Sequence, residues 1–165
     1  MKSAPASDDV FLESLRREDP LGAVVRAHIH IEARLNRVLE ALTPFPEQLP
    51  KGLRYEQRVR LAVALGLSEE ILKPLKILGD IRNDFAHALD VKLTDEMANR
   101  LWQSFSKDDK DTILQAYGNT QSQFKETGMP EFSKADARHR FIAMAVALDK
   151  YLIVSENEAL AARHT

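Results

Sequence analysis

Apolar residues recur every three or four positions along nearly the whole chain, and this spacing restricts the folds that the chain can adopt. It is the pattern of amphipathic α-helices, in which such positions share one face. The longest case is residues 21–42, whose apolar stripe consists of Val24, Val25, Ile29, Ile31, Leu35, Val38, Leu39 and Leu42. No segment keeps the alternation of period two that indicates a half-buried strand. The sequence therefore predicts an all-α protein.

Prolines, glycines and capping residues divide this pattern into separate helices. We expect helices at residues 10–18, 21–42, 53–66, 74–89, 95–105 and 107–118, and a long final helix that Ser133 and Asp136 begin. The expected connections are loops at residues 43–52 and 119–132 and a short turn at residues 68–73. We expect the turn to end at residue 73, because Pro74 fits only in the first turn of a helix or at a kink.

The length of 165 residues supports one hydrophobic core and is short for two. We therefore predict a single all-helical bundle of about five to seven helices, comprising residues 9–160. Residues 1–8 are expected to be a disordered lead-in, and residues 161–165 a C-terminal tail.

Composition excludes several classes of function. The chain has no cysteine, so disulfides, thiolate catalysis and cysteine-ligated zinc are excluded. No apolar run reaches the roughly 18 residues that span a bilayer, and no secretory signal is evident, so we expect a cytoplasmic protein without membrane contact. A net charge of −2 provides no overall basic field for nucleic acid. Local arginines could still bind it, although a single arginine such as Arg34 is expected on a solvated helix face.

Residues 81–87, "IRNDFAH", place polar side chains in a segment whose neighbours have the pattern of buried helix. Asn83 and His87 are four residues apart and share one helix face, and the long Arg82 side chain reaches the same edge. A histidine exchanges a proton near neutral pH. An arginine binds phosphate and balances the charge that develops on its oxygens, and an asparagine orients either group. These residue types suit metal-independent cleavage of RNA, whose own 2′-hydroxyl would be the nucleophile.

A structural interpretation explains the same residues. Arg82 could pair with Asp84 or with a glutamate of a neighbouring helix, and His87 could interact with the C-terminal end of its helix, which favours a cation. Spacing alone favours this interpretation over catalysis. One histidine is also a small acid–base set for RNA cleavage. The catalytic interpretation therefore predicts a two-fold dimer that brings two copies of the helix together.

The stretch "RNDFAH" resembles the R-N-x-x-x-H form of the motif of the HEPN superfamily (higher eukaryotes and prokaryotes nucleotide-binding domains). The wider stretch "RVRLAVALGLSEEILKPLKILGDIRNDFAH" is similar to the central region of mannitol operon repressor-like proteins, and "AHIHIEARLNRVLEAL" resembles their first long helix. The similarity covers roughly residues 21–89. It implies a dimeric all-helical fold with the motif near the dimer cleft. In active members the arginine and the histidine cleave RNA without metal, and these correspond to Arg82 and His87, with Asn83 as the polar residue between them.

We therefore expect a homodimeric HEPN-type endoribonuclease that uses no metal or cofactor, in a toxin, defence or regulatory role. The expected catalytic residues are Arg82, Asn83 and His87, and the expected substrate contacts are Arg54, Arg58 and Asp84. RNA is the expected substrate, and an antitoxin or regulatory protein is a further expected partner. The alternative is a non-catalytic transcriptional regulator of the mannitol operon repressor type, which acts through protein or DNA contacts. An antitoxin-like or adaptor bundle is a third interpretation.

A second polar segment, "HIHIE", places His28 and Glu32 four residues apart on one helix face, with His30 away from them. A metal site would need a third convergent ligand, so ordinary surface positions are expected here. A secondary hypothesis is that His28, Glu32 or Arg34 lines the same cleft as His87.

Overall fold

The computed structural model describes residues 7–87, 91–123 and 128–163, and it confirms the predicted all-α bundle. Within these ranges the chain forms seven α-helices and no strand. The helices are α1 (Ser7–Arg16), α2 (Pro20–Leu42), α3 (Tyr55–Ala64), α4 (Leu72–His87), α5 (Asp95–Ser104), α6 (Lys107–Gln123) and α7 (Ala137–Ala162). None of the helices described has the length and apolar character needed to cross a membrane.

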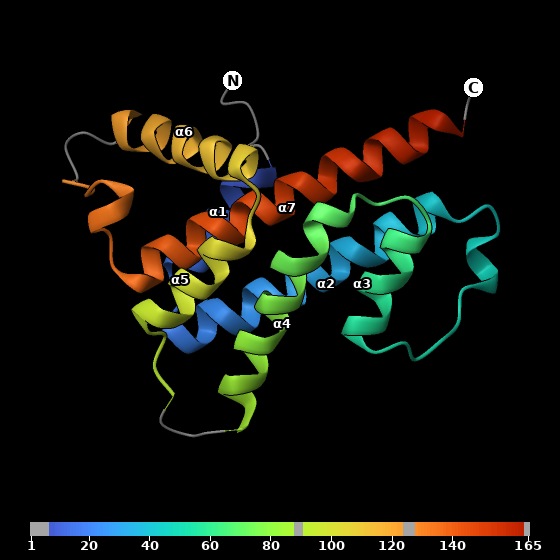
Figure 1. Cartoon of the computed structure of the whole chain (residues 1–165), viewed down its shortest axis with the longest axis horizontal. Helices are drawn as coiled ribbons and strands as arrows, with labels where there is room; N and C mark the ends of the chain where they lie inside the picture. The colour runs from blue at the N-terminus through green and yellow to red at the C-terminus, as the bar shows by residue number, and fades with distance from the viewer. Residues whose placement is uncertain (1–6, 88–90, 124–127, 164–165) are drawn as a thin grey trace.

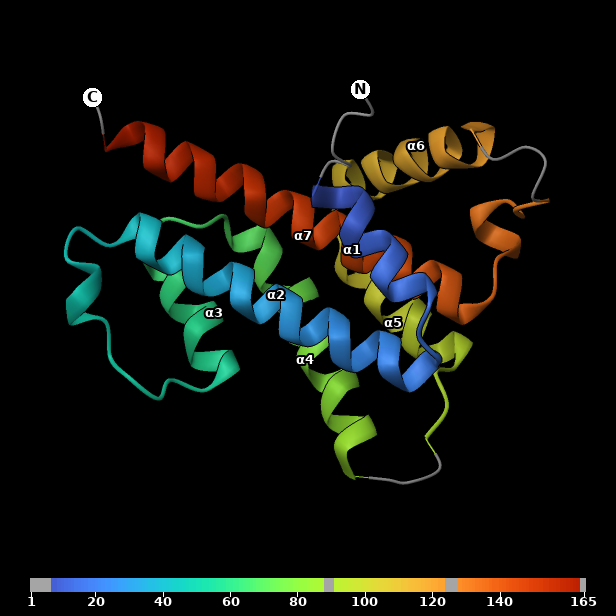
Figure 2. The ribbon, with the colours of Figure 1, turned by 180° about the vertical axis from the view of Figure 1, so that it is seen from behind.

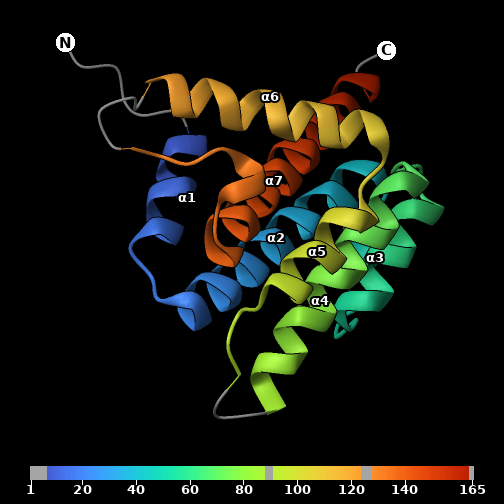
Figure 3. The same cartoon turned by 60° about the vertical axis from the view of Figure 1, so that its left-hand side comes forward.

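The two longest helices, α2 and α7, lie side by side at the centre and run in the same direction (Figures 1 and 2). The remaining helices pack around this pair: α3 and α4 against α2, α5 against α4 and α7, and α1 against both long helices. Figure 3 shows α6 extended across one side of the bundle, over α7. The core is one continuous cluster in which Ile31 and Leu35 of α2 and Met144 and Leu148 of α7 are fully buried.

Side-chain caps fix several helix starts where the sequence indicates them. The Thr94 hydroxyl accepts a hydrogen bond from the backbone N–H of Met97 at 3.3 Å, and Asp136 accepts one from the N–H of His139 at 2.8 Å. Such caps satisfy backbone donors that have no partner within the helix. Ser133, which we expected to open the final helix with Asp136, lies instead in the short 3₁₀ turn Phe132–Lys134.

Several predicted boundaries are wrong by a few residues. α6 continues to Gln123, so residues 119–123, predicted to begin a loop, are helical. Their polar side chains are compatible with a helix because Thr120 and Ser122 donate to carbonyl oxygens one turn earlier. α1 begins at Ser7 inside the predicted lead-in, and α7 extends to Ala162 inside the predicted tail. Residues 1–6, 88–90, 124–127 and 164–165 lie outside the described residues.

One part of the predicted α2 stripe does not face the core. Val25 is 37% exposed and Ile29 is 62% exposed, and Leu21, four residues before Val25, is 49% exposed. The buried face of α2 contacts α3, α4 and α7. Leu21, Val25 and Ile29 lie outside that buried face. We call Leu21, Val25 and Ile29 the α2 ridge. It is an apolar surface that the described residues leave partly exposed.

Candidate functional site

The predicted motif lies in the last turns of α4. Ile81 and Phe85 are buried and anchor this part of the helix, because they belong to the core cluster. Arg82, Asn83 and His87 are exposed, as a site that binds substrate requires. The helical period thus separates the anchoring side chains from the polar ones along a single segment.

A polar cleft of about 410 Å³ lies between α2, α3 and α4. Its lining residues are His28, Glu32, Arg54, Tyr55, Glu56, Lys76, Gly79, Asp80, Arg82 and Asn83. The structure therefore brings together three of the predicted site residues, Arg82, Asn83 and Arg54. The other three, Arg58, Asp84 and His87, are not among the lining residues. His87 is one helical turn beyond Asn83 on the same face of α4, at the C-terminal end of the helix.

Arg82 and Asp84 do not form the ion pair that the structural interpretation predicted. The Arg82 Nη1 atom donates to the Asn83 side-chain oxygen at 3.1 Å. Asp84 instead pairs with Arg100 of α5, whose Nη2 atom lies 3.2 Å from the Asp84 carboxylate. Residues two apart on a helix point to different sides, so Asp84 faces α5 while Arg82 faces the polar cleft.

The ionisable groups that line the polar cleft balance formally, with three cations and three anions. The cations are Arg54, Lys76 and Arg82, and the anions are Glu32, Glu56 and Asp80. Two arginines outside the lining change this balance. Arg58 Nη1 donates to Glu32 at 2.8 Å, and Arg60 Nη2 donates to Glu56 at 3.1 Å.

These pairs leave two cations of the polar cleft available to a ligand. Within the described residues neither Arg54 nor Arg82 forms an ion pair, while Lys76 lies 3.8 Å from Glu56. Arg58, the other arginine predicted to contact the substrate, differs from Arg54 because its guanidinium is paired with Glu32. The electrostatics of the cleft are therefore mixed, with three acidic groups and with Arg54 and Arg82 as cations that no described acidic group pairs.

His28 is the histidine that lies inside the polar cleft. His28 is only 6% exposed, and its ring packs against the ring of Tyr55 with a centroid separation of 4.4 Å. The His28 Nδ1 atom lies 3.9 Å from the Glu32 carboxylate, which is beyond hydrogen-bonding distance. Burial lowers the pKa of His28; the Glu32 carboxylate opposes the lowering and the Arg82 guanidinium adds to it. The imidazole is therefore held in its neutral form near neutral pH.

Tyr55 fixes the wall of the cleft behind His28. Its hydroxyl donates to the backbone carbonyl of Leu75 at 2.9 Å, and burial raises its pKa. The ring lies directly on α4 at Gly79, where an added Cβ would lie 2.8 Å from the Tyr55 Cε1 atom. A glycine is thus required for α3 and α4 to approach this closely. The role of Gly79 has no local signal in the sequence.

The secondary hypothesis, that His28, Glu32 or Arg34 lines the same cleft as His87, is not borne out by the polar cleft. His28 and Glu32 share the polar cleft with Arg82, although His87 is not part of its lining. Arg34 lies on another face of α2, is only 9% exposed and donates from Nε to Asp149 of α7 at 3.0 Å. The expectation that Arg34 is solvated is therefore wrong, since its partner is 115 residues away in the sequence.

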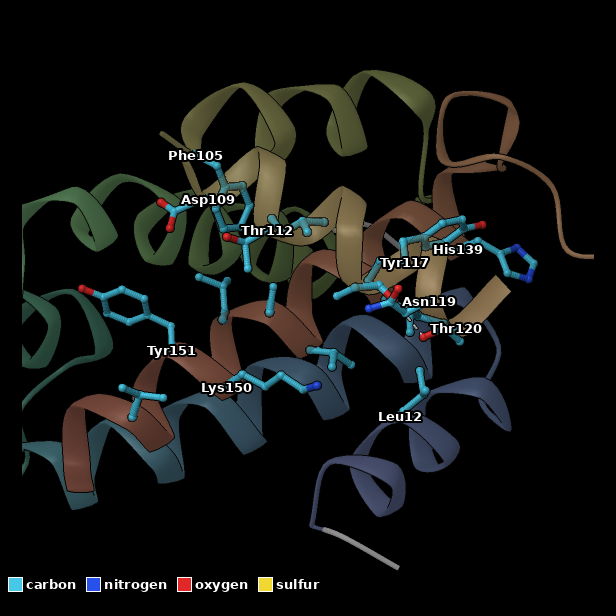
Figure 4. A pocket seen from close by; sticks show the side chains of 18 of the residues that line it. Leu12, Phe105, Asp109, Thr112, Tyr117, Asn119, Thr120, His139, Lys150 and Tyr151 are labelled. Carbon is cyan, nitrogen blue, oxygen red and sulfur yellow. Dashed lines mark hydrogen bonds between the residues drawn. The ribbon is translucent and has the colours of Figure 1, made fainter. Parts of the chain in front are cut away.

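A second, larger cavity of about 580 Å³ lies between α1, α6 and α7. We call it the apolar groove. Figure 4 shows Leu12, Phe105 and Tyr117 around it, with Lys150 extended along α7. Its lining is mainly aliphatic and aromatic, which suits contact with an apolar body better than with a phosphate. None of the residues predicted for the site belongs to it.

Within the described residues, no three His, Asp or Glu side chains gather in a way that could hold a metal ion. In comparisons with protein-family models, curated proteins and solved structures, no significant match to this chain is found. The polar cleft and the residues that form it are therefore the features of this chain that point to a function.

Proposed function

We propose that this protein is a HEPN-type, metal-independent endoribonuclease that binds RNA phosphate at the polar cleft. The observation that carries the proposal is that Arg82, Asn83 and Arg54 line one cleft while His87 is exposed one turn further along α4. Two arginines that no described acidic side chain pairs, together with a nearby accessible imidazole, are the groups that phosphodiester cleavage needs.

Each residue has a defined role in the proposed reaction. Arg82 binds the scissile phosphate and balances the charge on its oxygens. Asn83, already hydrogen-bonded to Arg82 at 3.1 Å, orients the guanidinium. His87 exchanges a proton with the reacting oxygens. Attack by the neighbouring 2′-hydroxyl leaves a 2′,3′-cyclic phosphate and a free 5′-hydroxyl.

The proposal includes a homodimer, and the α2 ridge supports it. Leu21, Val25 and Ile29 form an exposed apolar line along the helix that also carries His28 and Glu32. Exposed apolar surfaces of this kind are often covered by a partner. A second copy seated here would bring two clefts close together. Sedimentation equilibrium should show a dimer for the wild type and a monomer for Ile29→Glu; a wild-type monomer would contradict this part of the proposal.

The activity is tested by incubating purified protein with mixed single-stranded RNA in EDTA. We expect the wild type to produce 2′,3′-cyclic phosphate ends, and Arg82→Ala and His87→Ala to lose this activity. His87 is exposed at a helix end, so its replacement should leave the fold intact. Arg37→Ala, which removes an exposed arginine of α2 outside the polar cleft, is the matched control. A folded dimeric wild type that leaves RNA intact would exclude the enzyme.

The balanced charges of the polar cleft favour a second candidate function, a non-catalytic regulator that acts through protein or DNA contacts. Three acidic groups in the lining oppose a simple anion-binding role. In that case Arg82 and Asn83 would bind a partner or support the dimer. This function would be supported over the first if neither the wild type nor His87→Ala cleaved RNA and both remained dimeric.

A further inference from the structure

The histidine of the motif and the histidine of the cleft are different residues. His87 lies at the exposed end of α4, whereas His28 lines the polar cleft together with Arg82 and Asn83. RNA cleavage by its 2′-hydroxyl needs one group that accepts a proton and one that donates a proton. The motif supplies one imidazole per protomer, and the fold adds a second from another helix.

The position of His28 is built into the packing of three helices. α2 carries the ring, and Tyr55 of α3 packs against it at a centroid separation of 4.4 Å. Gly79 of α4 leaves room for Tyr55, whose hydroxyl is tied to the Leu75 carbonyl at 2.9 Å. The ring is held on one side by an anchored aromatic residue and lines the cleft on the other, and with only 6% of the residue exposed it has few orientations available. Such restriction is what a proton-transfer group requires.

We propose that His28 is the general base that accepts the proton of the RNA 2′-hydroxyl in the polar cleft. The inference rests on the proposed function and names the base within it. The 2′-oxygen forms a bond to phosphorus, the bond from phosphorus to the 5′-oxygen breaks, and the 2′-hydroxyl proton moves to a ring nitrogen of His28. The departing 5′-oxygen takes a proton from His87 or from water. A substrate without a 2′-hydroxyl cannot react in this way, so the substrate class is RNA.

The titratable groups around His28 set the pH range in which it acts. They are Glu32 of α2, Arg54, Tyr55, Glu56 and Arg58 at α3, and Lys76, Asp80 and Arg82 of α4. Burial and the nearby Arg82 disfavour the imidazolium, and Glu32 opposes them in part. The pKa of His28 is lowered, so the base is neutral and ready to accept a proton at neutral pH.

The test compares His28→Gln with the wild type in single-turnover cleavage of a single-stranded RNA in EDTA. We expect a loss of about 10²–10⁴-fold in the rate of cleavage, the usual contribution of a general base. The acid limb of the wild-type pH–rate profile should lie below pH 6.5, the ordinary pKa of histidine, and should be absent from the residual activity of the variant. A purely structural role would lower the rate without removing this limb. His139→Gln, a histidine of α7 outside the polar cleft, is the control.

A second measurement covers the case in which His28→Gln does not fold. Ring ¹⁵N resonances of the wild type are followed by NMR while adenosine 3′-monophosphate is added, and we expect the His28 ring to respond as the phosphate binds. The inference would be overturned if His28→Gln cleaved RNA within about threefold of the wild-type rate, or if the His28 ring resonances did not change on addition of the nucleotide. Either result would leave the proposed nuclease activity unaffected. A wild type without cleavage would overturn the proposed function itself, and the role of His28 with it.

Discussion

His28 and His30 are two residues apart on α2, and they occupy opposite kinds of environment. His28 lines the polar cleft, with only 7% of its side chain exposed. His30 lies between α1 and α7, and its ring stacks on Phe11 of α1 with a centroid separation of 3.9 Å. Its Nε2 atom lies 3.2 Å from the Asp149 carboxylate. One helix thus presents one imidazole to the polar cleft and another to the packing between α1, α2 and α7.

The partners of the two histidines explain the difference. Asp149 is only 1% exposed and also accepts a hydrogen bond from Arg34, whose Nη1 atom lies 3.6 Å from Glu156. Burial alone would raise the pKa of Asp149, but contacts from His30 and Arg34 outweigh it, so the pKa lies below its usual value. We call Asp149, Arg34, His30 and Glu156 the buried ion network. Within it Arg34 pairs with two carboxylates, whereas no described acidic group pairs with Arg54 or Arg82 of the cleft.

The comparison predicts its largest effect for a break in the buried ion network. Asp149→Ala would leave the buried Arg34 guanidinium without its main partner, and such a loss costs about 3–5 kcal/mol of unfolding free energy. Urea denaturation followed by circular dichroism measures it. The companion protein is the double variant Arg34→Met/Asp149→Leu, in which apolar side chains replace both charges. It should recover much of the lost unfolding free energy. A cost under about 1 kcal/mol for Asp149→Ala would show that water reaches the network.

The pH dependence of stability should separate the two environments. The lowered pKa of Asp149 stabilises the fold above its usual value of 3.8, and this stability is lost as the pH falls through the lower folded pKa. The lowered pKa of His28 has the same sign in a higher window, with stability lost as the pH falls below 6.5. Each slope is at most about 1.4 kcal/mol per pH unit, the limit for one proton. Urea denaturation is repeated from acid to neutral pH. Asp149→Asn should reduce the dependence of the unfolding free energy on pH in the lower window, and His28→Gln should reduce it in the upper window. The same slopes in wild type and variants would contradict the assignment.

A smaller loss is expected where the cleft wall is anchored. Tyr55→Phe removes the hydroxyl that donates to the Leu75 carbonyl, at a cost of about 0.5–1.5 kcal/mol. Thermal unfolding followed by circular dichroism is the measurement. Tyr151→Phe, at the edge of the apolar groove, should cost less and serves as the control. Equal losses would mean that the hydrogen bond to α4 contributes nothing measurable.

The smallest effect is expected at the surface pair of Asp84 and Arg100. Both side chains are about half exposed, so water and salt screen their attraction. Asp84→Ala should change the free energy of unfolding by no more than about 0.5 kcal/mol. Urea denaturation at low and high salt tests this. A larger, salt-resistant loss would place Asp84 in a structural role that its exposure does not indicate.

Local patterns predicted most of the fold and part of the candidate site. Helical spacing and caps such as Thr94 depend on residues within one or two turns, so the sequence predicts them directly. The placement of Arg82 and Asn83 on an exposed edge follows from the same spacing. Val25 and Ile29 were expected in the core and are exposed, because spacing does not show which side of an apolar stripe a neighbour covers.

By itself, the sequence determined that this protein is helical and that an arginine, an asparagine and a histidine follow one another on one segment. The tertiary structure decided which side chains meet. It placed His28 beside Arg82, buried Arg34 against Asp149, and left His87 outside the lining of the cleft. The physical reason is range: helix formation depends on residues a few positions apart, whereas burial and charge pairing depend on residues that only packing brings together.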